Sequence, residues 1–393
     1  MERNINFGNT FFKAPIKHIL YVTCLLLFIS CENKNSKVLK NADGHLSLVF
    51  EKQSSSIFFS DRIFKKIEIT PLETADDCLV GEDPELLSDD HHYFIRDYQQ
   101  EFILRFDKSG KFINRIGRRG GGPGEYKAIE DYYIDSKAKV VEVLETYGPI
   151  LRYKYDGTFI SSMKVDGFAN SFIKTGDTYW INRGMNHELA SDGRLFKVSE
   201  DGTVIDRFLP LKTHWPSITE QCFSRSGNII SFKECLSHLV YRIIDDGPVK
   251  TTVIDFGKYD IPQYLYSRDF PAAIDALRSK GYASIEKYLE NNKFIYIFFR
   301  VTQYGKNTDI YNHWLVNKNT GNSVLQKLSH DDPLWVMMEN AKVLTDDDKL
   351  IFIANAQMFK ECIDPFFNNT NLTMASLSEE SNPVIVSLQI NDF

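Results

Sequence analysis

A short motif recurs along this chain: an apolar stretch, a tight turn that contains glycine, and a second apolar stretch. The turn glycines are separated by 47, 45, 45 and 74 residues, and they are Gly110, Gly157, Gly202, Gly247 and Gly321. Apolar stretches on both sides of such a turn are typical of β-hairpins. A unit of about 45 residues with four strands is typical of a propeller blade. The sequence therefore predicts five blades, whose hairpins are residues 103–117, 150–165, 195–210, 239–257 and 313–328.

The two ends of this region supply a sixth blade. Residues 382–390, NPVIVSLQI, have the pattern of a third strand, and residues 62–73, RIFKKIEITPLE, have that of a fourth. Pairing them closes the ring and removes two exposed sheet edges. We therefore expect an all-β, six-bladed β-propeller of four-stranded antiparallel blades, closed by its N- and C-terminal strands, over residues 46–393.

The longest interval between turn glycines requires an insertion. Residues 260–291 contain Pro271 where a helix can begin. Further along, apolar residues fall at near-helical spacing, at Ala283, Ile285, Tyr288 and Leu289. The sequence predicts a short helical insertion over about residues 260–291.

The first thirty residues have a different character. The apolar run ILYVTCLLLFIS, residues 19–30, is too short to span a bilayer but suits the core of a signal peptide. It ends in serine followed by Cys31, which resembles a bacterial lipobox, where the signal is cut before a cysteine that then carries lipid. We expect residues 1–30 to be a lipoprotein signal peptide, Cys31 the lipid attachment site, and residues 31–45 a flexible tether. An ordinary secretory signal with an incidental cysteine is the alternative.

The net charge and the spacing of the cysteines limit which classes of ligand are expected. The formal net charge is -7, and an acidic surface repels phosphate backbones, so nucleic acid is not expected as a partner. The cysteines form no C-x-x-C pair, so the sequence does not support a zinc site, and no cofactor is expected. A disulfide between Cys222 and Cys235 is compatible with an oxidising compartment but is not implied.

The segment GRRGGGPGEY, residues 117–126, is rich in glycine and carries two arginines. A phosphate-binding loop would need lysine and Ser or Thr after its last glycine, and a dinucleotide fingerprint would need a following helix; neither is present. The segment is better interpreted as a tight joint between one blade and the next. In such a joint the glycines serve the backbone, while the side chains could face the central funnel. We therefore name as candidate ligand-binding residues Arg118, Arg119, Glu125 and Tyr126.

These motifs resemble the Bacteroidales-type six-bladed β-propeller lipoproteins, a family similar in architecture to NHL-like and TolB-like propellers. The resemblance rests on the lipobox, on residues 67–81, 106–126 and 255–262, and on the C-terminal strand, so it covers nearly the whole mature chain. It implies a propeller fold and a lipid anchor in the outer membrane, facing the periplasm or the cell surface. It implies little about activity, because propellers host many functions.

The sequence does not favour an enzyme. Two acidic clusters could supply calcium ligands, as in propeller hydrolases, but both fall where hairpin tips are expected: Asp89, Asp90, His91 and His92 in one, and Asp346, Asp347 and Asp348 in the other. The chain has neither a G-x-S-x-G elbow nor a Ser-x-x-Lys motif. We expect a non-catalytic recognition or scaffold module that binds a protein or glycan at the funnel and serves glycan or nutrient uptake. A propeller hydrolase or lyase with a metal in the funnel is the alternative.

Overall fold

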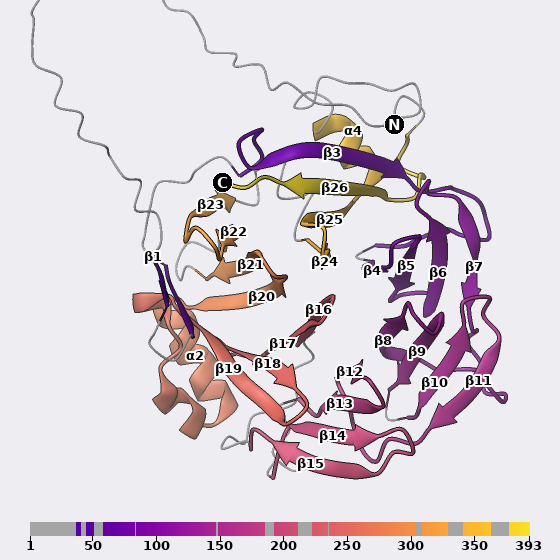
Figure 1. Cartoon of the computed structure of the whole chain (residues 1–393), viewed down its shortest axis with the longest axis horizontal. Coiled ribbons are helices and arrows are strands. Elements are labelled where there is room, and N and C mark those ends of the chain that lie inside the picture. The colour runs from indigo at the N-terminus through magenta and orange to yellow at the C-terminus, as the bar shows by residue number, and fades with distance from the viewer. Residues whose placement is uncertain are drawn as a thin grey trace, which may run out of the picture.

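The computed structural model describes residues 37–40, 45–50, 58–82, 84–146, 148–184, 192–210, 222–234, 236–302, 309–328, 341–362 and 377–393. These residues form six β-sheets arranged in a ring, which confirms the predicted six-bladed β-propeller (Figure 1). The predicted signal peptide and Cys31 lie outside the described residues. No helix among the described residues is long and apolar enough to cross a membrane.

Blades 1 to 3 are regular and each contains four antiparallel strands, numbered from the axis to the rim. Blade 1 contains β4 (Glu85–Ser88), β5 (His92–Asp97), β6 (Phe102–Asp107) and β7 (Phe112–Ile116). Blade 2 contains β8 (Ile129–Asp135), β9 (Val140–Glu145), β10 (Ile150–Lys154) and β11 (Phe159–Met163). Blade 3 contains β12 (Ser171–Thr175), β13 (Thr178–Asn182), β14 (Leu195–Ser199) and β15 (Val204–Phe208).

Blades 4 to 6 follow the same plan with departures. Blade 4 contains β16 (Phe223–Ser226), β17 (Ile229–Lys233), β18 (Leu239–Ile244) and β19 (Gly247–Asp255). Blade 5 contains β20 (Ala283–Glu290), β21 (Phe294–Val301), β22 (Ile310–Asn317) and β23 (Ser323–Leu328). Blade 6 contains β24 (Val343–Leu344), β25 (Lys349–Ala354), β26 (Val384–Ile390) and β3 (Phe64–Pro71), with helix α4 (Ala356–Cys362) between β25 and β26.

The turn glycines have a reason that the repeat alone does not give. Each lies in the turn between the third and fourth strands, and in blades 1 to 4 this turn packs against the preceding blade. Gly157 has φ +87°, and a Cβ atom added there would lie 2.6 Å from the carbonyl oxygen of Arg115, at the end of the preceding outer strand. Gly110 meets the carbonyl of Pro71 in the same way. Glycine is therefore required at these positions for two reasons: the backbone is left-handed, and the neighbouring blade approaches too closely for a Cβ atom.

The ring closes through the pairing predicted from the two ends of the sequence. Strands β26 and β3 are antiparallel, with Val384 opposite Pro71 and Leu388 opposite Ile67. Figure 1 shows the two strands side by side, the first from the C-terminal and the second from the N-terminal part of the chain. Blade 6 therefore has no open edge between its third and fourth strands.

An additional hairpin covers the edge of blade 4. Residues 37–40 were expected in the flexible tether, but they form strand β1 (Lys37–Lys40), which pairs with β2 (Leu46–Val49). Strand β2 then pairs in parallel with β19, with Leu46 opposite Thr252. Leu48 is 0% exposed and packs into the core between blades 4 and 5. The ordered part of the chain thus begins before residue 46, because the outer strand of blade 4 supplies a partner.

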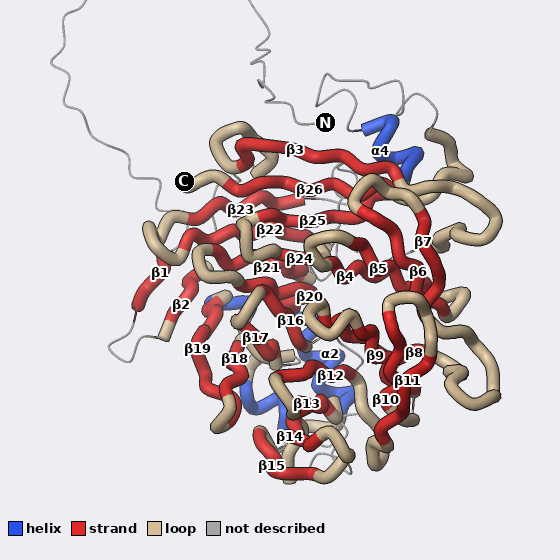
Figure 2. Tube along the Cα trace, turned by 45° about the vertical axis from the view of Figure 1, so that its right-hand side comes forward, coloured by secondary structure: helices blue, strands red, loops and turns tan. Residues whose placement is uncertain are grey.

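The predicted helical insertion is only partly correct. After β19 come two 3-10 turns, η1 (Gly257–Tyr259) and η2 (Gln263–Ser267), and helix α2 (Phe270–Lys280), in which Pro271 occupies the first turn as expected. Residues 283–290, however, form strand β20. A bulge between Ile285 and Lys287 shifts the strand's alternation by one residue, so its apolar positions imitate helical spacing. Figure 2 shows how little of the fold is helical, with the helices in blue among strands in red.

Candidate functional site

The glycine-rich segment joins β7 to β8, as predicted, and its side chains hold the loop together. The Glu125 carboxylate accepts the amide of Gly122 at 2.8 Å and forms an ion pair of 2.5 Å with exposed Arg118. Tyr126 is 0% exposed and its hydroxyl donates to the carbonyl of Ile116 at 3.2 Å. Glu125 therefore helps to hold the loop, Tyr126 is a core residue, and a ligand-binding role for either stays a prediction.

The same loop lies against the outer hairpin of blade 2. Gly124 has φ +75°, its carbonyl accepts the Tyr153 hydroxyl at 3.0 Å, and a Cβ there would lie 2.6 Å from the ring of Phe159 on β11. Arg118 and Arg119 are exposed beside this contact. A binding role for the two arginines stays a prediction.

Both acidic clusters lie at the expected tips between first and second strands. Asp89 accepts the amides of His91 and His92 and the hydroxyl of Tyr155, at 2.8, 2.6 and 2.8 Å. Burial tends to raise the pKa of Asp89, but these hydrogen bonds outweigh it and hold the pKa below its usual value. In the described part of the chain, no three His, Cys, Asp or Glu side chains form a group that could hold a metal.

Contacts between inner strands cross the axis on this face. Arg225 of β16 donates to the Tyr133 hydroxyl on blade 2 and, at 3.1 Å, to the carbonyl of Lys174 on blade 3. The neighbouring Ser226 hydroxyl donates to Asp346 on blade 6 at 2.7 Å. These hydrogen bonds link blade 4 to three other blades across the centre of the ring. Arg225 and Ser226 therefore have a structural role.

The inner strands also carry charged side chains. Burial, together with the charge of Glu85, raises the pKa of Asp131 to about 8, and burial lowers the pKa of Lys287 to about 8. Both side chains are only half-buried by area, but they lie on the inner strands β8 and β20, where the surrounding blades limit their solvation. Groups that titrate near neutral pH are often functional. Asp131 nevertheless also accepts the amide of Phe172 at 2.9 Å, which joins blades 2 and 3 and indicates a structural role.

A basic residue recurs five positions before the turn glycine in the first four blades. It lies on the third strand, and each copy has a different partner, on the next blade for three copies and on its own blade for Arg152. Arg105 lies over the ring of Tyr155, Lys197 donates to the carbonyl of Asp245, and Arg152 pairs with Glu142 at 3.1 Å. The fourth copy, Arg242, reaches Glu290 of blade 5 at 2.6 Å.

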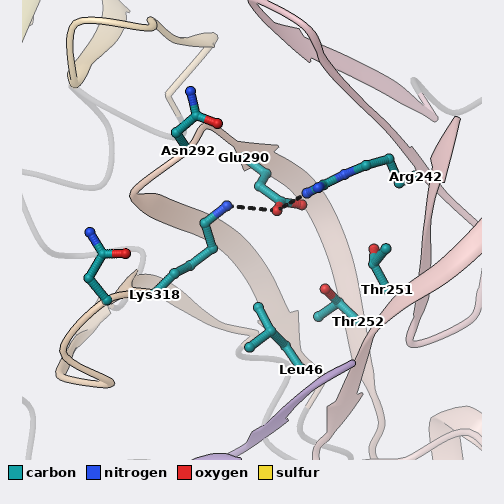
Figure 3. Close-up of a pocket in the computed structure, with 8 residues that line it drawn as sticks. Leu46, Arg242, Thr251, Thr252, Glu290, Asn292 and Lys318 are labelled. Carbon is teal, nitrogen blue, oxygen red and sulfur yellow. Dashed lines mark hydrogen bonds and ion pairs between the residues drawn. The ribbon is translucent and has the colours of Figure 1, made fainter. Parts of the chain in front are cut away.

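The groove between blades 4 and 5 opens into a pocket with a volume of about 250 Å³. Figure 3 shows Arg242 and Lys318 pointing at the Glu290 carboxylate from two sides. Lys318 lies 2.9 Å from the same oxygen as Arg242, and the Tyr288 hydroxyl donates to the other oxygen at 2.9 Å. Burial and the Glu290 charge raise the pKa of Tyr288 well above its usual value, so it stays a donor. The lining residues are Leu46, Arg242, Thr251, Thr252, Glu290, Asn292, Lys318 and Asn319.

The charges of this Arg242–Lys318 pocket do not balance. Counted over the described lining residues alone, two cations surround one carboxylate, an excess of one positive charge, and the remaining lining groups are amides, hydroxyls and one leucine. The buried carboxylate of Glu290 holds the two cations at fixed positions. An arrangement of this kind can accept an anionic group and hydrogen-bond to hydroxyls.

Residues 45–389 match the sequence family described as a domain of unknown function, DUF4934. The chain belongs to the DUF4934 family. No curated protein matches its sequence.

Two crystal structures resemble the fold of this DUF4934 protein. A Bacteroides fragilis protein described as exported is 17% identical, with a TM-score of 0.71, over 88% of this chain and 99% of that one. A member of the DUF4221 family from Bacteroides vulgatus is 11% identical, with a TM-score of 0.53, over 84% of this chain and 97% of that one. At these identities the likeness shows a shared propeller fold.

The sequence of the DUF4934 protein contains one signal for the pocket. The basic residue at a fixed distance before the turn glycine is visible in Arg105, Arg152, Lys197 and Arg242. It identifies side chains that face the grooves between blades, but not which groove is open. Only the fold shows that the fourth copy meets a second cation.

Proposed function

We propose that this DUF4934 protein is a lipid-anchored, non-catalytic recognition module of the cell envelope that binds a small, anionic, hydroxyl-rich ligand in the Arg242–Lys318 pocket. The observation that carries the proposal is the pair of cations held around one buried carboxylate in a polar cavity. An acidic sugar has the required chemistry, because it combines a carboxylate with several hydroxyls.

Preorganisation supports an anionic ligand. Arg242 and Lys318 approach the same oxygen of Glu290, at 2.6 and 2.9 Å, so their positions are already fixed before a ligand arrives. A ligand that meets fixed donors loses less conformational entropy on binding. The net positive charge then favours an anion over a neutral ligand of the same shape.

The pocket's size and lining support a single sugar unit. Its volume is below the roughly 300–1,000 Å³ typical of pockets for drug-sized ligands. Asn292, Asn319 and Thr251 offer amide and hydroxyl groups, and no aromatic ring belongs to the lining found among the described residues. Recognition is therefore by hydrogen bonds and charge, without ring stacking.

Export and anchoring belong to the same proposal. The Bacteroides fragilis protein with the same fold is described as exported. In this chain, the apolar run before Cys31 suits a signal peptide and the cysteine resembles a lipidation site. We place the propeller at the outer membrane, facing the periplasm or the surface, where it would serve glycan or nutrient uptake.

Binding is tested with Arg242→Gln and its repeat counterpart Arg105→Gln. Calorimetry would measure binding of oligosaccharides that contain glucuronic acid, beside their neutral glucose counterparts. Because the pocket loses its charge excess, Arg242→Gln should weaken the acidic ligand about tenfold or more, while Arg105→Gln should leave it within about twofold. Equal affinity of the wild type for acidic and neutral sugars, or equal loss in both variants, would contradict the proposal.

The anchor is tested separately with Cys31→Ala. Without the cysteine the chain cannot be acylated, so it should leave the membrane fraction or keep its signal uncleaved. Fractionation with and without detergent measures this, and Cys78→Ala serves as a control for loss of an unrelated cysteine. If Cys31→Ala stays in the membrane as a cleaved protein, the lipid assignment is wrong.

A further inference from the structure

We infer that the helical insertion of this protein, residues 257–281, is the surface that rests on the lipid bilayer. The inference depends on the lipid anchor at Cys31 in the proposed function, and it adds an orientation that the anchor alone does not give. Three features carry it: the short distance from the anchor to β1, the position of β1 beside the insertion, and the exposed side chains of the insertion.

The chain between the anchor and the fold is short. Six Cα steps separate Cys31 from Lys37, where β1 begins. A fully extended chain spans at most about 3.5 Å per residue, so β1 begins within about 20 Å of the lipidated cysteine. A compact domain of this size has a radius of gyration of about 20 Å. The tether is therefore too short for the propeller to turn freely, and the end of β1 that receives the chain must face the membrane.

That end of β1 lies next to the insertion. Lys37 pairs with Val49, and Val49 pairs with Asp255, the last residue of β19. Neighbouring strands are about 5 Å apart, so the chain enters about 10 Å from Asp255. The insertion begins at Gly257, two residues after Asp255, so its start lies close to this end of β1.

The insertion is built as a firm platform with an amphipathic surface. Leu265, Ala273 and Leu277 form a small core of their own. Outside it, Tyr264 is 49% exposed, and the Arg268 guanidinium lies 5.5 Å from the centre of its ring. Exposed tyrosine with neighbouring cations is typical of residues at a membrane interface.

The exposed charges of the insertion are mixed, so the tether and the tyrosine must produce the contact. Among the side chains described there, the exposed cations Lys258, Arg268 and Lys280 exceed the exposed carboxylates Asp269 and Asp275 by only one. Contact should therefore not depend on anionic lipid. The orientation also presents the pocket outward: β20 begins beside the insertion and ends at Glu290 in the pocket, about 25 Å away along the strand.

Site-specific photo-crosslinking tests the orientation in the full lipidated chain. A benzophenone amino acid is placed at Tyr264 or, as a matched control, at Ile160, which is 44% exposed on the outer strand of blade 2. In phosphatidylcholine vesicles, we expect about fivefold or more lipid capture at position 264 over position 160, because the tether raises the local lipid concentration there. Mass spectrometry of the N-terminal peptide shows whether Cys31 is acylated.

The outcomes separate the inference from the anchor. An acylated protein that captures lipid equally at both positions, or more at position 160, overturns the orientation and leaves the anchor in place. A protein without acyl at Cys31 overturns the anchor and the orientation with it. A twenty-residue Gly-Ser insertion after residue 36 should reduce capture at position 264 to the control level. Undiminished capture in that variant would contradict the argument from tether length.

Discussion

Blades 1 to 3 and blades 4 and 5 are built on one plan and differ in what is added to it. In blades 1 to 3 the outer strand forms the rim of the propeller. Each of these strands has an exposed isoleucine three residues after the turn glycine: Ile113, Ile160 and Ile205. In blade 4 the outer strand carries the β1–β2 hairpin, and between blades 4 and 5 the chain inserts α2. One of these additions, the β1–β2 hairpin, lines the pocket through Leu46.

The grooves between blades show the same difference at the level of single side chains. Arg152 in the second blade pairs with Glu142 of its own blade, whereas Arg242 in the fourth reaches across to Glu290 of blade 5 and meets Lys318. The repeat thus supplies a basic residue to the third strand of each of the first four blades, and at the fourth copy the added strand β2 contributes Leu46 to the pocket lining. Regular blades build the scaffold, and the departures from regularity build the site.

The largest effect should come from removing a part of the ring rather than an addition to it. Deletion of residues 382–393 removes β26 and leaves β3 without a partner, so cooperative unfolding should be lost and the bare edges should aggregate. Deletion of residues 37–49 removes Leu46 and Leu48 from the core and should cost about 4 kcal/mol, with the propeller still folded. Calorimetry and light scattering measure both. If the first variant stayed monomeric with an unchanged melting temperature, the closure of the ring would be wrong.

A smaller effect is expected when a turn glycine is replaced, and two turns can be compared: one in a regular blade, blade 2, and one in blade 5. At Gly157 an added Cβ lies 2.6 Å from a carbonyl oxygen of the preceding blade, whereas at Gly321 the nearest atom is 4.0 Å away. Both glycines have positive φ, +87° and +75°. Gly157→Ala should therefore cost roughly 3 kcal/mol or more, and Gly321→Ala only the roughly 1 kcal/mol of backbone strain. Equal losses in denaturant titrations would show that the neighbouring blade is not what requires glycine.

Much of this scaffold was predictable from the sequence, because its causes are local or periodic. The turn glycines and alternating apolar residues predicted the hairpins, and two unpaired terminal strands predicted the closure. The prediction of a helix over residues 283–290 was wrong because a single bulge changes the spacing of the inward residues. Strand β1 was missed since KVLK is too short to show a period, and its partner β2 is held by β19, about 200 positions further along the chain.

The site could not be predicted in the same way. The pocket combines Leu46, Arg242, Glu290 and Lys318, which no spacing in the sequence connects. The glycine-rich segment attracted attention because it is conspicuous, but Tyr126 is core and Glu125 closes the loop. Composition marks where a backbone is unusual, and a binding site depends on which distant side chains meet.

The dependence of stability on pH should reveal a buried histidine that is specific to blade 5. His313 is 0% exposed among phenylalanines and its Nδ1 lies 2.8 Å from the Tyr296 hydroxyl. Burial lowers its pKa to about 3, so the folded protein stays neutral there while the unfolded chain takes up a proton below about pH 6.5. Stability should be constant in this respect above pH 6.5 and fall as the pH decreases from 6.5 toward 3, by up to about 1.4 kcal/mol per unit.

The control for this titration is a histidine on a regular blade. His91 is exposed at the tip of blade 1, so His91→Asn should leave the slope between pH 6.5 and 5 unchanged. The variant His313→Asn should be less stable at pH 7.5. Its unfolding free energy should also depend less steeply on pH, by the slope that the uptake of one proton on unfolding produces. Identical slopes in the wild type and His313→Asn would show that the buried histidine is not the source.

The smallest effect is expected from Arg118→Ala with Arg119→Ala, and it decides between two sites for an anion. Arg118 pairs with Glu125 but is itself exposed, and exposed pairs contribute little. The double change should move the melting temperature by less than about 2 °C. If the ligand binds in the Arg242–Lys318 pocket, the double variant should bind glucuronic acid oligosaccharides within about twofold of the wild type, while Arg242→Gln loses about tenfold. The opposite ranking would place the anion at the glycine-rich loop of a regular blade, as the sequence alone predicts, and would remove the link between the departures from regularity and binding.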